Sequence, residues 1–360
     1  MNEFKIGNRI VGDNRPTYFI ADIASNHDGD LERAKELIRL AADAGADAAK
    51  FQNFRAEQFV SDRGFRGLGT YKSHQAKWKK SAFEIYKDAS IPWEWTPILK
   101  AECDRAGISY LSTPYDLGAI EMLDPYVPAF KIGSGDLTWH EICLHVARKA
   151  KPVILATGAS EIGEVQVVVY KLLALNPQLA LLQCNTNYTG SPENFGHVHL
   201  RVLNSFRVMF PQVVLGLSDH TPGHSAVLGA VALGGRVIEK HFTDDTSREG
   251  PDHPFSMTHK TWREMVDRTR ELEAALGRAT KEIAGNEHET VVVQRRSICA
   301  ASDLAAGTVL SRADLAMLRP APAGSLPPFE IDRVVGRTLA RDLRAGDHLT
   351  FFDLKGLGVA

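Results

Sequence analysis

The feature that most constrains the fold is an alternation of β-strand and helix patterns, which repeats eight times over about 260 residues. Each strand pattern is a short apolar run, and amphipathic helical segments lie between most of them. The strand patterns cover residues 18–24, 48–53, 109–114, 129–134, 152–158, 180–185, 213–218 and 236–242. Eight such units are typical of a closed (β/α)8 TIM barrel, which we predict; an open, doubly wound sheet is the alternative.

Two histidines follow directly after the last two strand patterns. They lie in the runs GLSDHT, which contains His220, and EKHFT, which contains His241. Neighbouring parallel strands present corresponding positions at the same sheet end, and barrel enzymes build their sites at the carboxyl end. Two imidazoles there are able to hold one divalent metal ion. Histidines that only pack at the rim are the alternative.

Polar side chains collect at most of the predicted strand ends, which favours a functional pocket at one barrel mouth. These residues are Asp22, Asn26, Lys50, Gln52, Thr113, Lys131, Ser134, Thr157, Asn185, Thr186, Tyr188, Ser218, His220, His241 and Asp244. Lys50 and Lys131 lie inside apolar segments, so each ammonium group needs an anionic partner. A salt bridge to a nearby acid would explain one lysine. Two lysines beside hydroxyl groups favour a phosphate or phosphate-plus-carboxylate ligand.

Two loops between these elements are candidates for binding. A Gly-Pro turn carries Asp252, which is a candidate to bind a polyol, although aspartate beside Gly-Pro often only forms the turn. The connection 55–91 is too long for a passive link, which is typical of lids and binding elements. It holds Arg63, Arg66, Tyr71, Lys72, His74 and Lys77. These side chains could face a substrate or a second subunit, and the sequence does not choose between them.

An internal repeat marks a separate C-terminal domain. Residues 301–315 match residues 340–354 at an offset of 39 residues, with eight of fifteen positions identical. We therefore predict a barrel over residues 1–280, a linker over 281–294 and a small pseudo-twofold domain over 295–360. Between the two halves of the repeat, Arg319 heads a proline-rich turn.

Composition describes an ordinary globular protein. The 360 residues carry a net charge of −2 and are 44% hydrophobic, which favours neither nucleic acid nor a membrane surface as partner. The first residues lack a secretory core, and no apolar run is long enough to span a bilayer. The four cysteines are far apart and form no CxxC pair, which indicates reduced thiols. We expect a cytoplasmic protein.

These motifs together resemble the sialic acid synthase family, the phosphoenolpyruvate-dependent synthases of sialic, legionaminic and pseudaminic acids. The resemblance covers nearly the whole chain. It rests on Asn26–Asp30 (NHDGD), residues 44–50 (AGADAAK), residues 131–135 (KIGSG), GLSDHT, EKHFT and residues 250–253 (GPDH), followed by the repeat domain. It implies a barrel followed by a small C-terminal β-clip, antifreeze-like (SAF) domain.

The resemblance also implies roles for individual residues. His220 and His241 would hold Mn²⁺ or Mg²⁺, which polarises the aldehyde of an open-chain N-acylated amino hexose. The phosphoenolpyruvate site would comprise Lys50, Thr113, Lys131, Ser134, Thr186 and Ser218, and the sugar site Gln52, Tyr188, Asp252 and Arg319. The catalytic set would be Asp22, Lys50, Lys131, His220 and His241. Arg319 would enter the barrel of a neighbouring subunit, which implies a domain-swapped homodimer.

Three positions depart from the family pattern. Asp22 replaces a glutamate, Ala156 a serine, and Thr186 the expected asparagine. Because these positions lie near both substrates, the acceptor stays open between N-acetylmannosamine and a 2,4-diacetamido hexose. Asp22 and Ala156 also leave open a non-catalytic sugar-binding or assembly protein on the same scaffold. A synthase of seven- or eight-carbon sugar acids is a further alternative, which the repeat domain disfavours.

Overall fold

The computed structural model describes residues 2–68 and 80–356. The chain divides into two compact units, Met1–Gly277 and Arg278–Ala360. The first unit is a closed barrel of parallel strands in the order β10-β3-β4-β5-β6-β7-β8-β9, so the predicted (β/α)8 fold is confirmed. The strands are β3 (Tyr18–Asp22), β4 (Ala48–Asn53), β5 (Ser109–Pro114), β6 (Phe130–Ile132), β7 (Val153–Ala156), β8 (Leu179–Cys184), β9 (Val214–Asp219) and β10 (Val237–His241).

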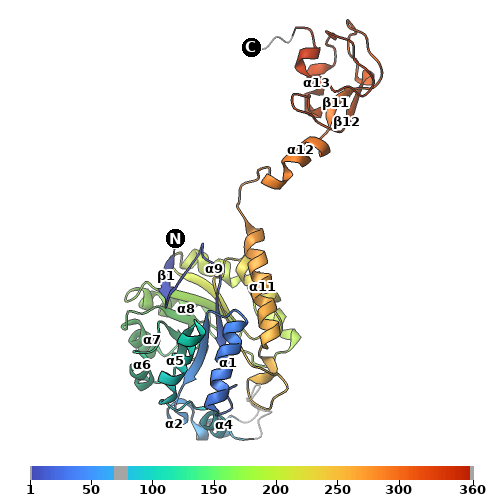
Figure 1. Ribbon diagram of the computed structural model, residues 1–360. Helices are drawn as coiled ribbons and strands as arrows, with labels where there is room; N and C mark the ends of the chain where they lie inside the picture. The colour runs from blue at the N-terminus through green and yellow to red at the C-terminus, as the bar shows by residue number, and fades with distance from the viewer. Residues whose placement is uncertain (1, 69–79, 357–360) are drawn as a thin grey trace. The chain divides into compact units, whose positions relative to one another are not determined.

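Helices surround these strands (Figure 1). They are α1 (Leu31–Asp43), α5 (Trp95–Ala106), α6 (Leu117–Leu123), α7 (His140–Ala147), α8 (Ile162–Leu173), α9 (Val202–Met209), α10 (Ser225–Ala232) and α11 (His259–Leu276). The first helix begins where the Asp30 carboxylate accepts hydrogen bonds from the backbone N–H groups of Glu32 and Arg33. The apolar faces of the helices and the outward side chains of the strands form one large core.

The alternation of side chains along the strands fixes what faces the barrel interior. Tyr18, Ile20, Ala48 and Val237 belong to the interior core, with their outward neighbours in the outer core. The same alternation brings Asp22, Lys50 and His241 to the inner face at the carboxyl ends.

Two features of the barrel unit were not predicted. A hairpin of β1 (Glu3–Ile6) and β2 (Arg9–Gly12) precedes the barrel, and its apolar side chains join the interior core. The connection 55–91 forms α2 (Ala56–Phe59), α3 (Asp62–Gly67) and α4 (Ala82–Ala89). Of the side chains there that could face a substrate or a second subunit, Tyr71, Lys72, His74 and Lys77 lie outside the described residues.

The second unit pairs the two halves of the sequence repeat. It contains α12 (His288–Gln294), which lies in the expected linker, β11 (Ser297–Ala300), β12 (Leu315–Leu318) and α13 (Ile331–Val334). Leu304 and Leu343 each donate a backbone hydrogen bond of 2.8 Å to the other's carbonyl oxygen. Asp303, in the first half, accepts a hydrogen bond of 2.8 Å from a backbone N–H of the second half. Asp342, in the second half, accepts one of 2.7 Å from a backbone N–H of the first. Equivalent residues thus make equivalent bonds, as the repeat predicts.

Candidate active site

A cavity of about 540 Å³ opens at the carboxyl ends of the strands. Its lining includes six of the residues expected to bind substrate or metal, namely Gln52, Ser134, Thr186, Tyr188, His241 and Asp252. It also includes Ser25, which comes from the loop after β3 and was not expected. Barrel enzymes use this end of the fold, and pockets of this size suit small molecules.

Both predicted lysines are buried, and each has a carboxylate partner. Lys50 Nζ lies 2.7 Å from Asp22 Oδ2 and donates to Thr113 Oγ1 at 3.4 Å. Lys131 Nζ lies 3.5 Å from Glu239 Oε1, which also accepts from Ser218 Oγ at 3.3 Å. The internal ion pairs that the sequence left as the alternative are therefore present at both lysines.

These carboxylates affect the charge of Lys50. Burial opposes the charged ammonium, but Asp22 and Glu239 outweigh burial and raise the pKa of Lys50 above its usual value. Lys50 is therefore a fixed positive charge beside hydroxyl groups, an arrangement suited to an anion.

The two histidines lie next to each other. Their ring centroids are 5.5 Å apart, and Asp22 Oδ2 lies 3.6 Å from His241 Nε2. His220 Nδ1 is 3.0 Å from the carbonyl oxygen of Asn185, so a proton on Nδ1 leaves Nε2 with its lone pair. The pKa of His241 is lowered chiefly by burial, which keeps this imidazole neutral. For His220 burial works in the same direction, but contacts with Cys184 and Asn185 outweigh it and raise the pKa.

The arrangement fits a two-imidazole metal site. His241 Nδ1 is buried and has no hydrogen-bond partner, although Asp252 Oδ2 is 3.9 Å away. A buried nitrogen without a partner is costly unless something else binds it. Among the described residues, however, no group of three or more His, Cys, Asp or Glu side chains is arranged to hold a metal ion. The candidate ligands in this part of the chain are thus the two imidazoles.

Asp252 is held in the cavity wall by the loop after β3. Its Oδ2 accepts from the Ser25 hydroxyl at 2.6 Å and from the Ser25 N–H at 3.2 Å. The side chain of Asn26 is fully buried and donates to Ser256 Oγ at 2.9 Å, and that hydroxyl donates to the Asp252 carbonyl at 2.7 Å. Both the side chain and the backbone of Asp252 are therefore fixed.

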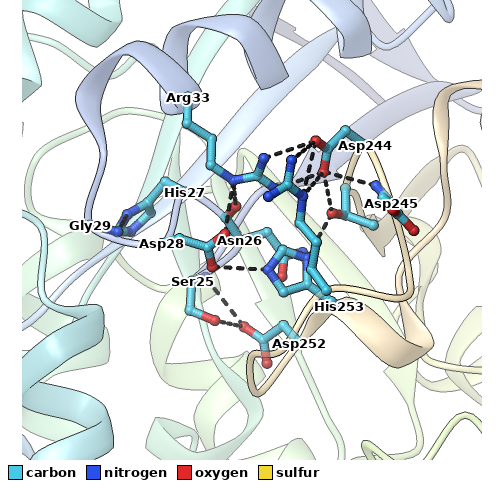
Figure 2. A network of polar contacts seen from close by, with 12 residues as sticks. Ser25, Asn26, His27, Asp28, Gly29, Arg33, Asp244, Asp245, Asp252 and His253 are labelled. Atoms are coloured by element: carbon cyan, nitrogen blue, oxygen red, sulfur yellow. Dashed lines mark hydrogen bonds and ion pairs between the residues drawn. The ribbon is translucent and has the colours of Figure 1, made fainter.

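A charged network ties the same two loops together farther from the cavity (Figure 2). Arg33 makes a bidentate contact with Asp244, at 2.8 and 2.6 Å, and lies 3.0 Å from Asp28. Asp28 in turn contacts His253 Nε2 at 2.9 Å. Hydrogen bonds from Arg33 and Arg248 hold the pKa of Asp244 well below its usual range, against the effect of burial. Since β3 and β10 are neighbours, this network links the first and last loops of the barrel mouth.

Of the remaining predicted residues, some lie in the barrel mouth and one lies in the second unit. Tyr188 packs its ring against His220 with centroids 4.4 Å apart, and Thr186 lines the cavity. Ala156 is buried in the interior core, and the hydroxyl of the neighbouring Thr157 donates to the Leu182 carbonyl oxygen. Arg319 belongs to the second unit, where its Nε donates to the Gln294 carbonyl at 2.7 Å. Its part in a sugar site stays a prediction.

Several lining residues were missed by the sequence reasoning. Asp136 lies just after β6 in a short 3-10 helix, Ser134–Asp136, and burial raises its pKa to about 6 against the opposing effect of Lys131. The sequence signal for Asp136 is its position two residues beyond Ser134, which was itself predicted to lie at the barrel mouth. The aromatic side chains of Phe54, Phe59, Tyr86 and Tyr115 also line the cavity. They come from distant segments, so no local pattern identified them.

The fold and the site together define a class, namely a TIM barrel whose mouth carries buried ammonium groups beside an imidazole pair and which is followed by a small β-rich domain. Residues 37–281 match the NeuB family model, and residues 295–355 match the SAF domain. The chain belongs to the NeuB family, the sialic acid synthase family that its motifs resemble.

Named relatives extend over both units. The chain is 35% identical to N,N'-diacetyllegionaminic acid synthase of Legionella pneumophila, over 94% of each chain. It is 32% identical to N-acetylneuraminate-9-phosphate synthase of Homo sapiens, over 91% of this chain and 90% of the human one. It also resembles the crystal structure of an N-acetylneuraminic acid synthetase from Leptospira borgpetersenii, with a TM-score of 0.70 and 29% identity over 81% of this chain and 95% of that one.

Proposed function

We propose that this chain is a phosphoenolpyruvate-dependent nonulosonic acid synthase. It condenses phosphoenolpyruvate with an open-chain N-acylated amino hexose, N-acetylmannosamine or a 2,4-diacetamido hexose, to give a sialic- or legionaminic-type acid and phosphate. One observation carries the proposal: Asp22 Oδ2 lies 2.7 Å from Lys50 Nζ and 3.6 Å from His241 Nε2. A cation suited to an anionic substrate and an imidazole suited to an aldehyde site thus share one carboxylate.

Phosphoenolpyruvate would lie against Lys50 and Lys131, with hydroxyl groups from Thr113, Ser134 and Ser218 as hydrogen-bond donors. In this complex the substrate's phosphate and carboxylate take over from Asp22 and Glu239 as partners of the ammonium groups. Because both lysines are fixed by the barrel strands, they face developing charge without having to reorganise.

The acceptor would lie with its aldehyde at His220 and His241 and its hydroxyl groups toward Gln52, Tyr188 and Asp252. A Mn²⁺ or Mg²⁺ ion bound by the two imidazoles would polarise the aldehyde carbonyl. Burial keeps His241 neutral, as a metal ligand must be. Asp252, fixed by Ser25, would hold the acceptor so that the aldehyde carbon faces the enol carbon of phosphoenolpyruvate.

The reaction balances as follows. The enol carbon forms a bond to the aldehyde carbon, whose oxygen becomes a hydroxyl group by gaining a proton. Water adds to the neighbouring carbon and loses a proton, which gives a tetrahedral intermediate, and the carbon–oxygen bond to phosphate then breaks. Asp22, between Lys50 and His241, is the carboxylate available to orient that water or carry its proton.

The decisive experiment incubates the protein with Mn²⁺, phosphoenolpyruvate and a panel of acceptors while following phosphate release. The panel contains N-acetylmannosamine, 2,4-diacetamido hexoses and unmodified sugars. We expect release that depends on an N-acylated acceptor. Background release with every acceptor would contradict the synthase and favour a sugar-binding or assembly protein.

The histidine pair gives a sharper test. We expect His220→Ala and His241→Ala each to lower kcat by at least about 100-fold, because the aldehyde loses its activation. Circular dichroism and thermal melting verify that the barrel is folded. His224→Ala serves as the matched control, because His224 follows the same strand, β9, as His220 but caps α10 and is half-buried, whereas His220 and His241 are buried. Near-normal rates in either site variant would overturn the metal assignment.

The arrangement of the whole chain is part of the proposal. We place the catalytic barrel in residues 1–280, a linker in 281–294 and the SAF domain in 295–360, within a cytoplasmic, domain-swapped homodimer. No helix among the described residues is long and apolar enough to cross a membrane. The match of the SAF model to residues 295–355 supports residue 295 as the start of the C-terminal domain.

A further inference from the structure

Four aromatic side chains form one packed group in the cavity lining, which we call the aromatic wall: Phe54, Phe59, Tyr86 and Tyr115. Phe59 contacts the other three, with ring centroids 5.1 Å from Phe54, 5.0 Å from Tyr86 and 4.5 Å from Tyr115. Phe54 also meets Tyr86 and Tyr115 edge-on at 5.8 and 5.7 Å. Such edge-to-face contacts hold rings in fixed positions.

The wall is held by the long connection after β4. Phe59 ends α2, and Tyr86 lies in α4, where Ile85 and Ala89 also line the cavity. Phe54 is buried, whereas Phe59 and Tyr86 are only half-buried, so part of their ring surface faces the cavity. An apolar surface of this kind inside a substrate cavity is suited to contact an apolar group of a ligand.

The wall is separate from the rings that touch the histidine pair. His241 packs against Phe255 at 4.9 Å and Tyr188 at 6.1 Å, and neither ring belongs to the wall. An acceptor whose aldehyde lies at the histidines would therefore reach the wall with another part of its skeleton.

The charged residues of the cavity lining indicate which chemical groups the part of the acceptor at the wall can carry. The described residues that line the cavity include Asp136 and Asp252 but neither lysine nor arginine. Among the described lining residues, a phosphate group placed against the wall would meet two carboxylates and no cation, so its lost hydration would not be compensated there, which is costly. An acyl methyl or deoxy methyl group would instead be stabilised by burial against the rings.

We propose that the aromatic wall selects the acceptor: the end of the sugar remote from the aldehyde is uncharged and carries an apolar substituent, such as an acylamido or a 6-deoxy methyl group. This inference rests on the proposed synthase function and specifies its substrate class. It makes Phe59 and Tyr86 specificity-determining residues of the site.

The test compares kcat/KM for three acceptors, measured with saturating phosphoenolpyruvate. They are a 6-deoxy 2,4-diacetamido hexose, N-acetylmannosamine and N-acetylmannosamine 6-phosphate. We expect the deoxy diacetamido sugar to exceed the phosphorylated sugar by at least about tenfold, since one buried methyl group is worth roughly 10- to 200-fold. A preference for the 6-phosphate would overturn the inference.

Substitutions of Phe59 test whether the aromatic wall causes the preference for the deoxy diacetamido sugar. Phe59→Ala should shrink the ratio between the first and last acceptor by about tenfold, and Phe59→Leu should largely retain it. Phe195→Ala, which truncates an exposed aromatic ring outside this cavity, is the matched control and should leave the ratio unchanged. An equal loss with all acceptors in Phe59→Ala would contradict a specificity role.

The outcomes separate the two proposals. Absence of turnover with every acceptor contradicts the synthase itself. Turnover with the opposite acceptor order contradicts only the role of the wall. If Phe59→Ala does not fold, the inference is still tested by the order of acceptors in the unaltered protein and by the kcat/KM ratio between the first and last acceptor in Phe59→Leu.

Discussion

Ser25 controls the orientation of Asp252, although it was not among the residues expected to bind substrate. Its hydroxyl and N–H both donate to Asp252 Oδ2, at 2.6 and 3.2 Å. We predict that Ser25→Ala raises KM for the acceptor about tenfold and changes KM for phosphoenolpyruvate little, because a hydrogen bond to a charged group contributes about 1.5–3 kcal/mol. Steady-state kinetics with each substrate varied in turn measures both constants. Ser25→Thr, which keeps the hydroxyl, should restore the acceptor KM; an equal rise in both constants would contradict a positioning role.

His27 should make stability depend on pH. Burial lowers its pKa from 6.5 to about 4; its Nδ1 accepts a hydrogen bond from the Gly29 N–H at 3.0 Å, and its buried Nε2 has no partner. The unfolded chain therefore takes up a proton below its pKa of 6.5, whereas the folded chain does so only near 4. The stability is fully present above the unfolded value and falls as pH drops toward the folded one, by about 3 kcal/mol in all.

Denaturant unfolding between pH 7 and pH 4 measures this loss. In His27→Gln the part of the slope that comes from this imidazole should disappear, although the variant is less stable at neutral pH. His288→Gln, a change in the exposed helix α12, should keep the slope of the unaltered protein. An unchanged slope in His27→Gln would show that another group is responsible.

At this scale the sequence identified which side chains face inward but not what they contact. Alternation along the strands placed Asp22, Lys50 and His241 on one face. Their mutual contacts depend on register: Asp22 lies opposite Lys50 on β4 and opposite His241 on β10. Register follows from how the barrel closes, which no local pattern records. Glu239 could not be foreseen as the partner of Lys131 for the same reason.

At the scale of elements, the strands that carry the histidines are locked to each other on their outward side. Lys240 Nζ lies 2.5 Å from Asp219 Oδ2 and donates to the Thr221 carbonyl at 2.6 Å, with both charged side chains fully buried. These residues alternate with His220 and His241, so the pair fixes the strand ends while the imidazoles face the cavity. Buried pairs often add specificity more than stability, and this one is placed to fix the separation of the two rings.

The elements that the sequence does not predict are those without a strong hydrophobic periodicity. The barrel strands were predicted because each lies in a short apolar run within a repeating strand–helix pattern. The strands β1 and β2, of four residues each, precede that pattern and have buried and exposed residues mixed along them. Helix α4 begins with a capping box at Ser81 and Glu84, which is the local sequence signal for its start. The aromatic wall joins residues 54 and 115 through tertiary packing alone.

At the scale of the whole molecule, Arg319 decides whether the site belongs to one chain or two. It is exposed in the C-terminal unit, and a domain swap would bring it to a partner's barrel. We predict that Arg319→Ala and His241→Ala are each inactive alone but recover activity when refolded together. Half of the dimers are then mixed and hold one intact site of two, so about one quarter of the full rate should return. Failure to recover activity would contradict the swapped arrangement.

In the proposed reaction, water adds to the enolpyruvyl carbon, and that carbon's bond to the phosphate oxygen then breaks. Turnover of phosphoenolpyruvate and the preferred acceptor in ¹⁸O-labelled water, followed by mass spectrometry of both products, tests it most directly. After exchange at the product's carbonyl form is corrected with an unlabelled product control, the account predicts ¹⁸O in the sugar acid and none in the released phosphate. Label in the phosphate would show that the phosphorus–oxygen bond breaks instead, and would contradict the account.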